Sequence, residues 1–438
     1  MNTQITNDLL SFINEARTQF HAVTALSKLL EKNGFSYLDE NKEWKIEKNA
    51  SYYTTRNASS LIAFKVGNTL ENYSFNMVAS HLDSPTFKIK PNSIIKKDKY
   101  ITINTEGYGG MILSTWLDRP LSIAGRVLLS EGNTVKSKLL TIERDLLLIP
   151  NLAIHLNRTI NDGFKYNKQI DMLPLFSMNL ENEDPFLDMI AKELHVSKQN
   201  VLTYDLYLYN RQAGGIWGYD SEFVSSGRLD DLQCTYPSIC GLIDSFTTNS
   251  VNVCCCFDNE EVGSGTMQGA ASNFLLTTLE RINQGLHKSS NDFNRALAAS
   301  LMVSADNAHA AHPNHLELSD SNNRVYMNQG VVIKFNAAQR YTSDGVTASL
   351  FMRYCKQAGV PYQFYTNRSD QLGGSTLGSI STSQVSVASV DVGLAQLSMH
   401  SSYETAGVKD TYYFYQVLLE YYNSHLSKNQ FGDYVITK

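Results

Sequence analysis

The sequence predicts an α/β fold in which a mixed, largely parallel sheet is flanked by helices and interrupted by a β-rich insertion. Two helix-like segments precede strand-like segments near the N-terminus, and from about residue 221 onward strand-like and helix-like segments alternate, which is typical of a sheet covered by helices. Between these parts, short strand-like segments follow one another without helices. At 438 residues the chain also exceeds what one hydrophobic core usually fills. We therefore expect an α/β domain from residues 1–91 and 221–438, and a β-rich insertion from residues 92–220.

The N-terminal segment carries apolar residues at helical spacing and stops at Asn33-Gly34, which predicts two amphipathic helices. The apolar positions are Leu9, Leu10, Phe12, Ile13, Ala22, Leu26, Leu29 and Leu30. Two strands are then expected in "SLIAFKVG" and "NYSFNMVASHLDSP", because each stretch alternates or runs apolar over strand length and stops at glycine or proline.

The expected insertion contains short β-like stretches such as "KYITINTEGYG", "LSIAGRVLLS" and "TYDLYLYN", separated by glycines and polar turns. After it, "VNVCCCF" reads as a buried strand and precedes a helix in "NFLLTTLERINQGL". The stretch "SLFMRYCKQAGVPYQFYT" reads as a helix, a glycine stop and a strand. In such a layer, functional groups collect beyond the carboxyl ends of the strands.

Composition excludes several classes of protein. The 37 basic and 43 acidic residues give a net charge of −6, with no basic run to follow a phosphate backbone, so no nucleic acid is expected. The sequence contains no run of eighteen consecutive apolar residues, so no membrane span is predicted. The N-terminus lacks the pattern of a secretory signal, and we therefore expect a cytoplasmic protein. Six cysteines without a CxxC spacing indicate neither a disulfide framework nor a thiolate metal site.

Five junctions between strand and loop end in groups that bind metals or move protons. They are "VASHLDSP" with His81 and Asp83, "SSGRLDDL" with Asp230 and Asp231, "CFDNEEVGS" with Glu260 and Glu261, "VSADNAHAAHPNH" with Asp306, and "LAQLSMHSSYETAG" with His400. Loops held by a rigid sheet are where reacting groups are placed, so the set as a whole indicates a site.

Imidazole and carboxylate are the ligands of a catalytic zinc site, and a two-metal site shares a bridging group. Asp83 lies on the same strand face as His81 and could accept the second ring N–H of that imidazole. Glu260 and Glu261 point in opposite directions in an extended chain, so one can ligate while the other faces the reacting water once the turn at Val262 brings both toward the site.

Each pattern also has a structural interpretation. His81 and His400 could be ordinary buried histidines, Asp230 or Asp231 could cap the following helix, and Glu260-Glu261 could be a first-turn pair favoured by the helix dipole. His309, His312 and His315 resemble a metal cluster, but they lie in a loop rich in proline and asparagine. We expect them to be mainly structural, and any functional role to be the support of a ligand or the fixing of that loop. Residue types alone therefore leave a metal site and a structural origin both open.

The ordered set "SHLDSP", "IPNLAIHLNR", "GRLDDL", "FDNEEVGS", "SADNAHAAHPN", "VIKFNAAQRY", "GGSTLG" and "LSMHS" closely resembles the M18 family of metallo-aminopeptidases, the aspartyl aminopeptidases and their bacterial relatives. The resemblance covers most of the chain. It implies a di-zinc exopeptidase whose α/β catalytic domain is interrupted by a β-rich domain used in homo-oligomer assembly, often into a tetrahedral dodecamer.

Position by position, the resemblance implies that Asp230 bridges two zinc ions. His81 and Asp306 would complete the first ion's ligands, and Glu261 and His400 those of the second. Glu260 would be the general base, and Asp83 the carboxylate that orients a ligand. The motif departs from the family's pattern where Gly227 precedes Arg228 and where Asp231 follows Asp230, positions at which proline and asparagine are usual.

Two further residues concern the substrate. Lys334 matches a family lysine that can meet an acidic substrate side chain, and His155 matches an insertion histidine that reaches a neighbouring subunit's site. We expect a zinc-dependent aminopeptidase that removes one N-terminal residue from peptides and prefers Asp or Glu. The alternatives are a preference for neutral residues, a related di-zinc deacylase or carboxypeptidase, and a binding shell without activity. Manganese and cobalt accept the same ligands as zinc.

Overall fold

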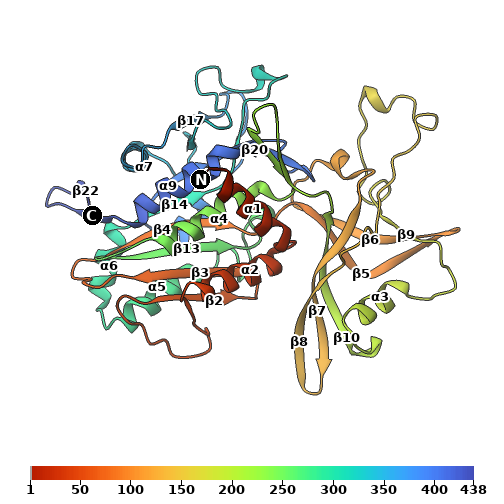
Figure 1. The fold of residues 1–438 in the computed structure, drawn as a ribbon, viewed down its shortest axis with the longest axis horizontal. Helices are drawn as coiled ribbons and strands as arrows, with labels where there is room; N and C mark the ends of the chain where they lie inside the picture. The colour runs from red at the N-terminus through yellow and green to blue at the C-terminus, as the bar shows by residue number, and fades with distance from the viewer. Residues whose placement is uncertain (1) are drawn as a thin grey trace.

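The computed structural model describes residues 2–438, and its largest sheet has nine strands in the order β1-β2-β3-β13-β4-β14-β18-β16-β17 (Figure 1). The strands are β1 (Ser36–Tyr37), β2 (Ser51–Arg56), β3 (Ser60–Val66), β4 (Ser74–His81), β13 (Ser250–Phe257), β14 (Leu301–Ala305), β16 (Val331–Phe335), β17 (Tyr362–Thr366) and β18 (Ala388–Gly393). The central strands β13, β4, β14 and β18 run parallel, while β2, β3 and β16 have antiparallel neighbours. The predicted mixed, largely parallel sheet is confirmed.

Helices cover both faces of this sheet. One face carries α1 (Asn2–Glu15), α2 (Gln19–Lys32), α4 (Leu229–Asp244), α7 (Gly345–Ala358) and α9 (Val408–Tyr422), and the other carries α5 (Phe274–Gly285), α6 (Ser290–Ala299) and α8 (Leu377–Gln384). The two N-terminal helices were expected, and α2 ends directly before Asn33. None of the helices in residues 2–438 is long and apolar enough to cross a membrane.

Strand β13 contributes side chains to both hydrophobic cores, one on each face of the sheet. Cys254 and Cys256 are fully buried in the core beneath α4 and α9, whereas Cys255 is fully buried in the core beneath α5 and α6. This alternation follows from the two-residue period of a strand whose faces are both covered. The cysteines therefore fill strand positions, as expected, and all six cysteines of the chain are free thiols.

A six-stranded antiparallel sheet lies beside the α/β layer (Figure 1). Its strands are β5 (Thr86–Lys97), β6 (Tyr100–Tyr108), β7 (Leu121–Glu131), β8 (Thr134–Thr141), β9 (Leu175–Ser177) and β10 (Val201–Asn210), and α3 (Pro185–Glu193) packs into its core. Because β5 begins at Thr86, the sheet also takes in residues just before position 92. A long, mostly irregular segment connects β8 to β9 and projects away from both sheets (Figure 1).

Smaller elements complete the fold. A five-stranded sheet contains β11 (Gly215–Trp217), β12 (Phe223–Ser226), β20 (Glu404–Gly407), β19 (Ala395–Leu397) and β15 (Ala308–His309). A hairpin of β21 (His425–Lys428) and β22 (Tyr434–Thr437) lies near the C-terminus, and single 3-10 turns occur at Leu113–Trp116, Ile160–Asp162, Lys198–Asn200, Glu260–Val262 and Leu316–Leu318.

Candidate active site

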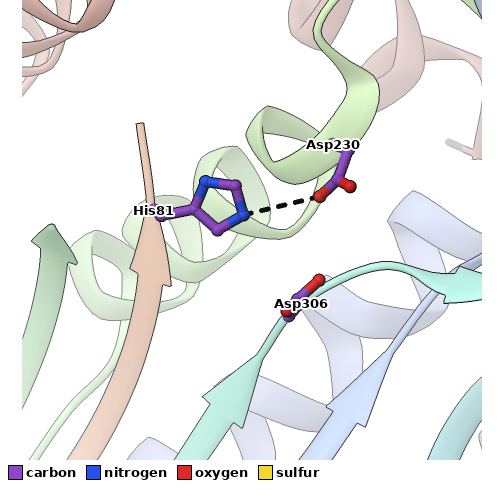
Figure 2. A group of neighbouring side chains, drawn as sticks. All are labelled: His81, Asp230 and Asp306. Carbon is purple, nitrogen blue, oxygen red and sulfur yellow. Dashed lines mark ion pairs between the residues drawn. The ribbon is translucent and has the colours of Figure 1, made fainter. Parts of the chain in front are cut away.

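The side chains singled out at the strand ends meet at one edge of the nine-stranded sheet. His81 is the last residue of β4, Glu260 and Glu261 form the 3-10 turn after β13, and Asp306 follows β14. These three strands are parallel neighbours, so their carboxyl ends share that edge. Asp230 comes from the first turn of α4, and His400 from the loop between β19 and β20. Figure 2 shows His81, Asp230 and Asp306 facing a common space.

Asp230 lies between two imidazoles. Its Oδ1 is 3.5 Å from Nε2 of His81 (Figure 2), and its Oδ2 is 3.5 Å from Nε2 of His400. His400 Nε2 is also 3.3 Å from Glu261 Oε1. Ligand-type atoms lie within 4.8 Å of one another in the trio of His81, Asp230 and Asp306, and again in the trio of Asp230, Glu261 and His400. Asp230 is common to both trios, as a bridging carboxylate must be.

Both imidazoles are held through their other ring nitrogen. His81 Nδ1 lies 3.0 Å from the backbone oxygen of Asp83, and His400 Nδ1 lies 2.8 Å from the backbone oxygen of Gly110. A carbonyl oxygen accepts a hydrogen bond and never donates one, so Nδ1 carries the proton in each ring. Nε2 of each ring then faces the carboxylates, and it can bind a metal when it carries no proton.

The Asp83 carboxylate holds the glutamate turn more directly than it holds His81. Its Oδ1 is 3.5 Å from His81 Nδ1, further than the backbone oxygen of the same residue. Instead, Oδ1 accepts the backbone N–H of Glu260 and Oδ2 that of Glu261, both at 3.1 Å. Oδ2 also accepts the hydroxyl of Tyr108 at 2.7 Å. The predicted side-chain contact to the ring is thus the weaker of its interactions.

The two adjacent aspartates face different partners. Arg228, with φ of +61°, leads into α4, and the first turn departs from helical φ/ψ at Asp230 and Asp231. Asp231 Oδ2 accepts the backbone N–H of His81 at 3.2 Å, so this side chain braces the end of β4. The Asp230 backbone N–H donates to Glu404 Oε2 at 3.1 Å. Of the two, only Asp230 belongs to a group able to hold a metal within residues 2–438.

The electrostatics of the cluster favour a cation. Burial, with a smaller contribution from neighbouring carboxylates, raises the pKa of Glu260 to about 8 and the pKa of Glu261 to about 7, although His81 and His400 act in the opposite direction. Burial likewise raises the pKa of Asp306. Within residues 2–438, neither Asp230 Oδ1 nor Glu261 Oε1 accepts a hydrogen bond, although both atoms are buried. Buried acceptors of this kind require a partner, and imidazole Nε2 with carboxylate oxygens is a zinc donor set. These residues therefore fit a metal ion.

The remaining predicted residues lie outside the two trios. Lys334, on β16, is buried, with Nζ 2.7 Å from the backbone oxygen of Asn307 and 3.8 Å from Asp306 Oδ1. His155 lies exposed in the segment between β8 and β9. His309 is beside Tyr365, with ring centroids 6.4 Å apart. His312 and His315 are exposed neighbours with ring centroids 5.1 Å apart, and His315 Nδ1 is 3.1 Å from Glu317 Oε1.

Three residues that contact the cluster were not among the sequence candidates. Tyr108 and Gly110 come from the end of β6 and the loop after it, and Glu404 begins β20. Glu404 accepts the backbone N–H groups of Asp230 and His400, at 3.1 and 2.9 Å, and burial raises its pKa to about 8. The paired glycines of "EGYGG" were the only local sequence signal for these contacts, because glycine pairs are typical of places where the backbone packs closely against other residues.

Comparisons with known proteins agree with this geometry. A family model described as aminopeptidase I zinc metalloprotease (M18) matches residues 12–422. A probable M18 family aminopeptidase 2 of Clostridium novyi is 48% identical over 424 residues, covering 95% of this chain and 98% of the relative. A relative of the same description from Clostridium acetobutylicum is 44% identical over 422 residues, with 95% and 98% covered.

Solved structures give the same answer. A chain in the cryo-EM structure of the Ape4 and Nbr1 complex has a TM-score of 0.93 at 36% identity, covering 97% of this chain and 86% of that one. A chain of the S. cerevisiae mApe1 dodecamer has a TM-score of 0.83 at 27% identity, covering 95% and 96%. Sequence and structure together place the chain in the M18 family of zinc metallo-aminopeptidases.

Proposed function

We propose that this aminopeptidase uses two zinc ions to remove a single N-terminal residue from peptides and that it prefers Asp or Glu at that position. The observation that carries the two-metal proposal is Asp230, whose two carboxylate oxygens face two different imidazoles, each at 3.5 Å. One ion would be held by His81, Asp230 and Asp306, and the other by Asp230, Glu261 and His400. Manganese or cobalt could occupy the same ligands.

Zinc, when bound, polarises the scissile carbonyl and lowers the pKa of a water molecule to about 7. The chain's own contribution is proton transfer and positioning. The Glu260 carboxylate accepts the proton that the attacking water loses and later donates it to the nitrogen of the leaving peptide. The position of Glu260 supports this role, because its carboxylate lies within 4.8 Å of ligand-type atoms of His81 and Glu261 and so beside both proposed metal positions. Asp83 holds the turn that carries this side chain.

The preference for an acidic residue rests on Lys334. The ammonium group is buried, donates to one backbone oxygen, and is 3.8 Å from Asp306. Burial opposes its positive charge, but Asp306, Tyr341 and Asp391 act together against that effect and raise the pKa of Lys334, so the group stays charged. An ammonium has three donors, which leaves capacity to meet a substrate carboxylate beside the first metal position.

We also propose that residues 1–91 and 221–438 form the catalytic domain and that residues 92–220 form an assembly domain. The mApe1 chain of similar fold is described as a dodecamer, which supports a homo-oligomer here, with a tetrahedral dodecamer as the specific proposal. The exposed segment containing His155 would then reach a neighbouring subunit's site. Six free cysteines support a reducing, cytoplasmic location.

A substrate panel tests the activity. The zinc-loaded protein is assayed on Asp, Glu, Leu and Ala p-nitroanilides, on N-acetylated amino acids, and on peptides blocked at the N-terminus. We expect release of p-nitroaniline from free N-termini, fastest for Asp and Glu, with no action on blocked peptides. Deacylation of N-acetyl amino acids or release of C-terminal residues would overturn the proposal in favour of the related di-zinc enzymes.

A further inference from the structure

Three consecutive residues from the six-stranded sheet touch the candidate metal cluster. Tyr108 is the last residue of β6, and Gly109 and Gly110 follow it. The Tyr108 hydroxyl donates to Asp83 Oδ2 at 2.7 Å and accepts a hydrogen bond from Asn259 Nδ2 at 2.9 Å. The backbone oxygen of Gly110 accepts from His400 Nδ1 at 2.8 Å. One short segment therefore contacts both the glutamate turn and a predicted ligand.

Gly109 is packed against a second predicted ligand. Its φ is +75°, and a Cβ added there would lie 3.2 Å from Cβ of Glu261 and 3.3 Å from Cβ of Pro85. A residue with a side chain would therefore be unfavourable here for two reasons. Its backbone would be strained at this φ, and its Cβ would lie very close to Cβ of Glu261. The backbone of residue 109 fits against Glu261 because glycine stands there.

These contacts fix the orientation of the predicted ligands. The Asp83 carboxylate that receives the Tyr108 hydroxyl also receives the backbone N–H groups of Glu260 and Glu261. The Gly110 oxygen holds the Nδ1 proton of His400, which leaves Nε2 directed at Glu261 and Asp230. Groups that hold ligands in this way change metal affinity or activity by about 10- to 100-fold when they are removed.

We infer that Tyr108, Gly109 and Gly110 form a brace that positions Glu261 and His400 for metal binding, so that the six-stranded sheet takes part in the site of its own chain. Tyr108 and Gly109 are positioning residues because they act through Asp83 and Glu261. The inference rests on the proposed two-metal function. It adds a role for the insertion that does not depend on a neighbouring subunit.

The test measures zinc release from the full-length, zinc-loaded protein into excess chelator, followed with a coloured zinc indicator. Tyr108→Phe removes only the hydroxyl, and its control is Tyr100→Phe, on the same strand with a half-exposed ring. Gly109→Ala is matched by Gly132→Ala, because Gly132 has φ of +62° but nothing within 4 Å of an added Cβ. The two glycine variants share the backbone strain and differ in the contact with Glu261.

We expect one of two zinc ions to leave about 10- to 100-fold faster from Tyr108→Phe and Gly109→Ala, while both control variants behave as wild type. Glu261→Gln identifies the affected ion, because it removes a ligand of the same position. Wild-type release rates in both brace variants would overturn the inference. Failure of the wild-type protein to bind two zinc ions would instead overturn the proposed function. If circular dichroism shows that Gly109→Ala does not fold, Tyr108→Phe decides the question alone.

Discussion

Glu260 and Glu261 are adjacent, yet we expect their substitution by glutamine to have different effects: loss of turnover for Glu260 and loss of metal for Glu261. Glu260→Gln keeps the shape of the side chain and removes its ability to take a proton. In residues 2–438 the Glu260 carboxylate makes no hydrogen bond, so the substitution removes a charge near His81 without breaking a side-chain hydrogen bond. General-base catalysis contributes about 10²- to 10⁴-fold, so we expect kcat to fall by that factor, or about 3–5 kcal/mol in the activation free energy.

Glu261→Gln is expected to lose metal first. Glu261 Oε1 is buried, accepts no hydrogen bond within residues 2–438, and faces His400 Nε2 at 3.3 Å. The assay therefore combines zinc per subunit, measured by atomic emission, with kcat on Asp p-nitroanilide at saturating zinc. Near-normal turnover of Glu260→Gln with both ions bound would refute the assigned base. Loss of zinc from Glu260→Gln would instead make Glu260 a ligand, because it also lies in a group with His81 and Glu261.

Three further outcomes are expected. Lys334→Met keeps the length of the side chain and removes its charge. It should lower kcat/KM for Asp substrates about 10- to 100-fold more than for Leu substrates, because a hydrogen bond to a charged group contributes about 1.5–3 kcal/mol. Equal losses for both substrates would indicate a structural lysine. Chelation should lower the unfolding temperature in calorimetry and zinc should restore it, since a ligand at 1,000 times its Kd adds about 4 kcal/mol; an unchanged temperature would contradict metal binding. Burial raises the pKa of Asp410 from 3.8 to about 7, so the folded state holds its proton longer than the unfolded state. Asp410 alone should therefore lower the free energy of unfolding by up to about 4 kcal/mol as pH rises from about 4 to about 7. Asp410→Asn should remove this share of the slope in urea titrations, whereas an identical slope in the variant would refute it.

The sequence allowed the fold class to be predicted because strand-like and helix-like periodicities alternate clearly. It also allowed the meeting of His81, Glu260, Glu261 and Asp306 to be predicted, because they follow parallel strands that end at one edge of the sheet. Asp230, in the first turn of α4, and His400, in the loop after β19, come from outside the nine-stranded sheet, so its topology does not predict that they meet His81. The assignment of metal ligands and base remains a prediction that the variants above test.

Other contacts could not be predicted from local pattern. Tyr108 reaches Asp83 from a different sheet, and Glu404 supports Asp230 across the fold. A tyrosine at the end of one strand and a glutamate at the start of another have many ordinary explanations, and only the tertiary arrangement selects one. The position of the Asp83 carboxylate was also missed, since spacing places it near His81 but does not show that the turn at Glu260 and Glu261 offers it two N–H groups.

The place of β13 in the nine-stranded sheet has a consequence for biosynthesis. β3 and β4 are consecutive along the chain, yet β13 lies between them in the sheet. A ribosome therefore releases both flanking strands, and the whole six-stranded sheet, before the strand that joins them exists. His400 emerges later still. A partly synthesised chain therefore lacks part of the predicted ligand set until residue 400 has been added.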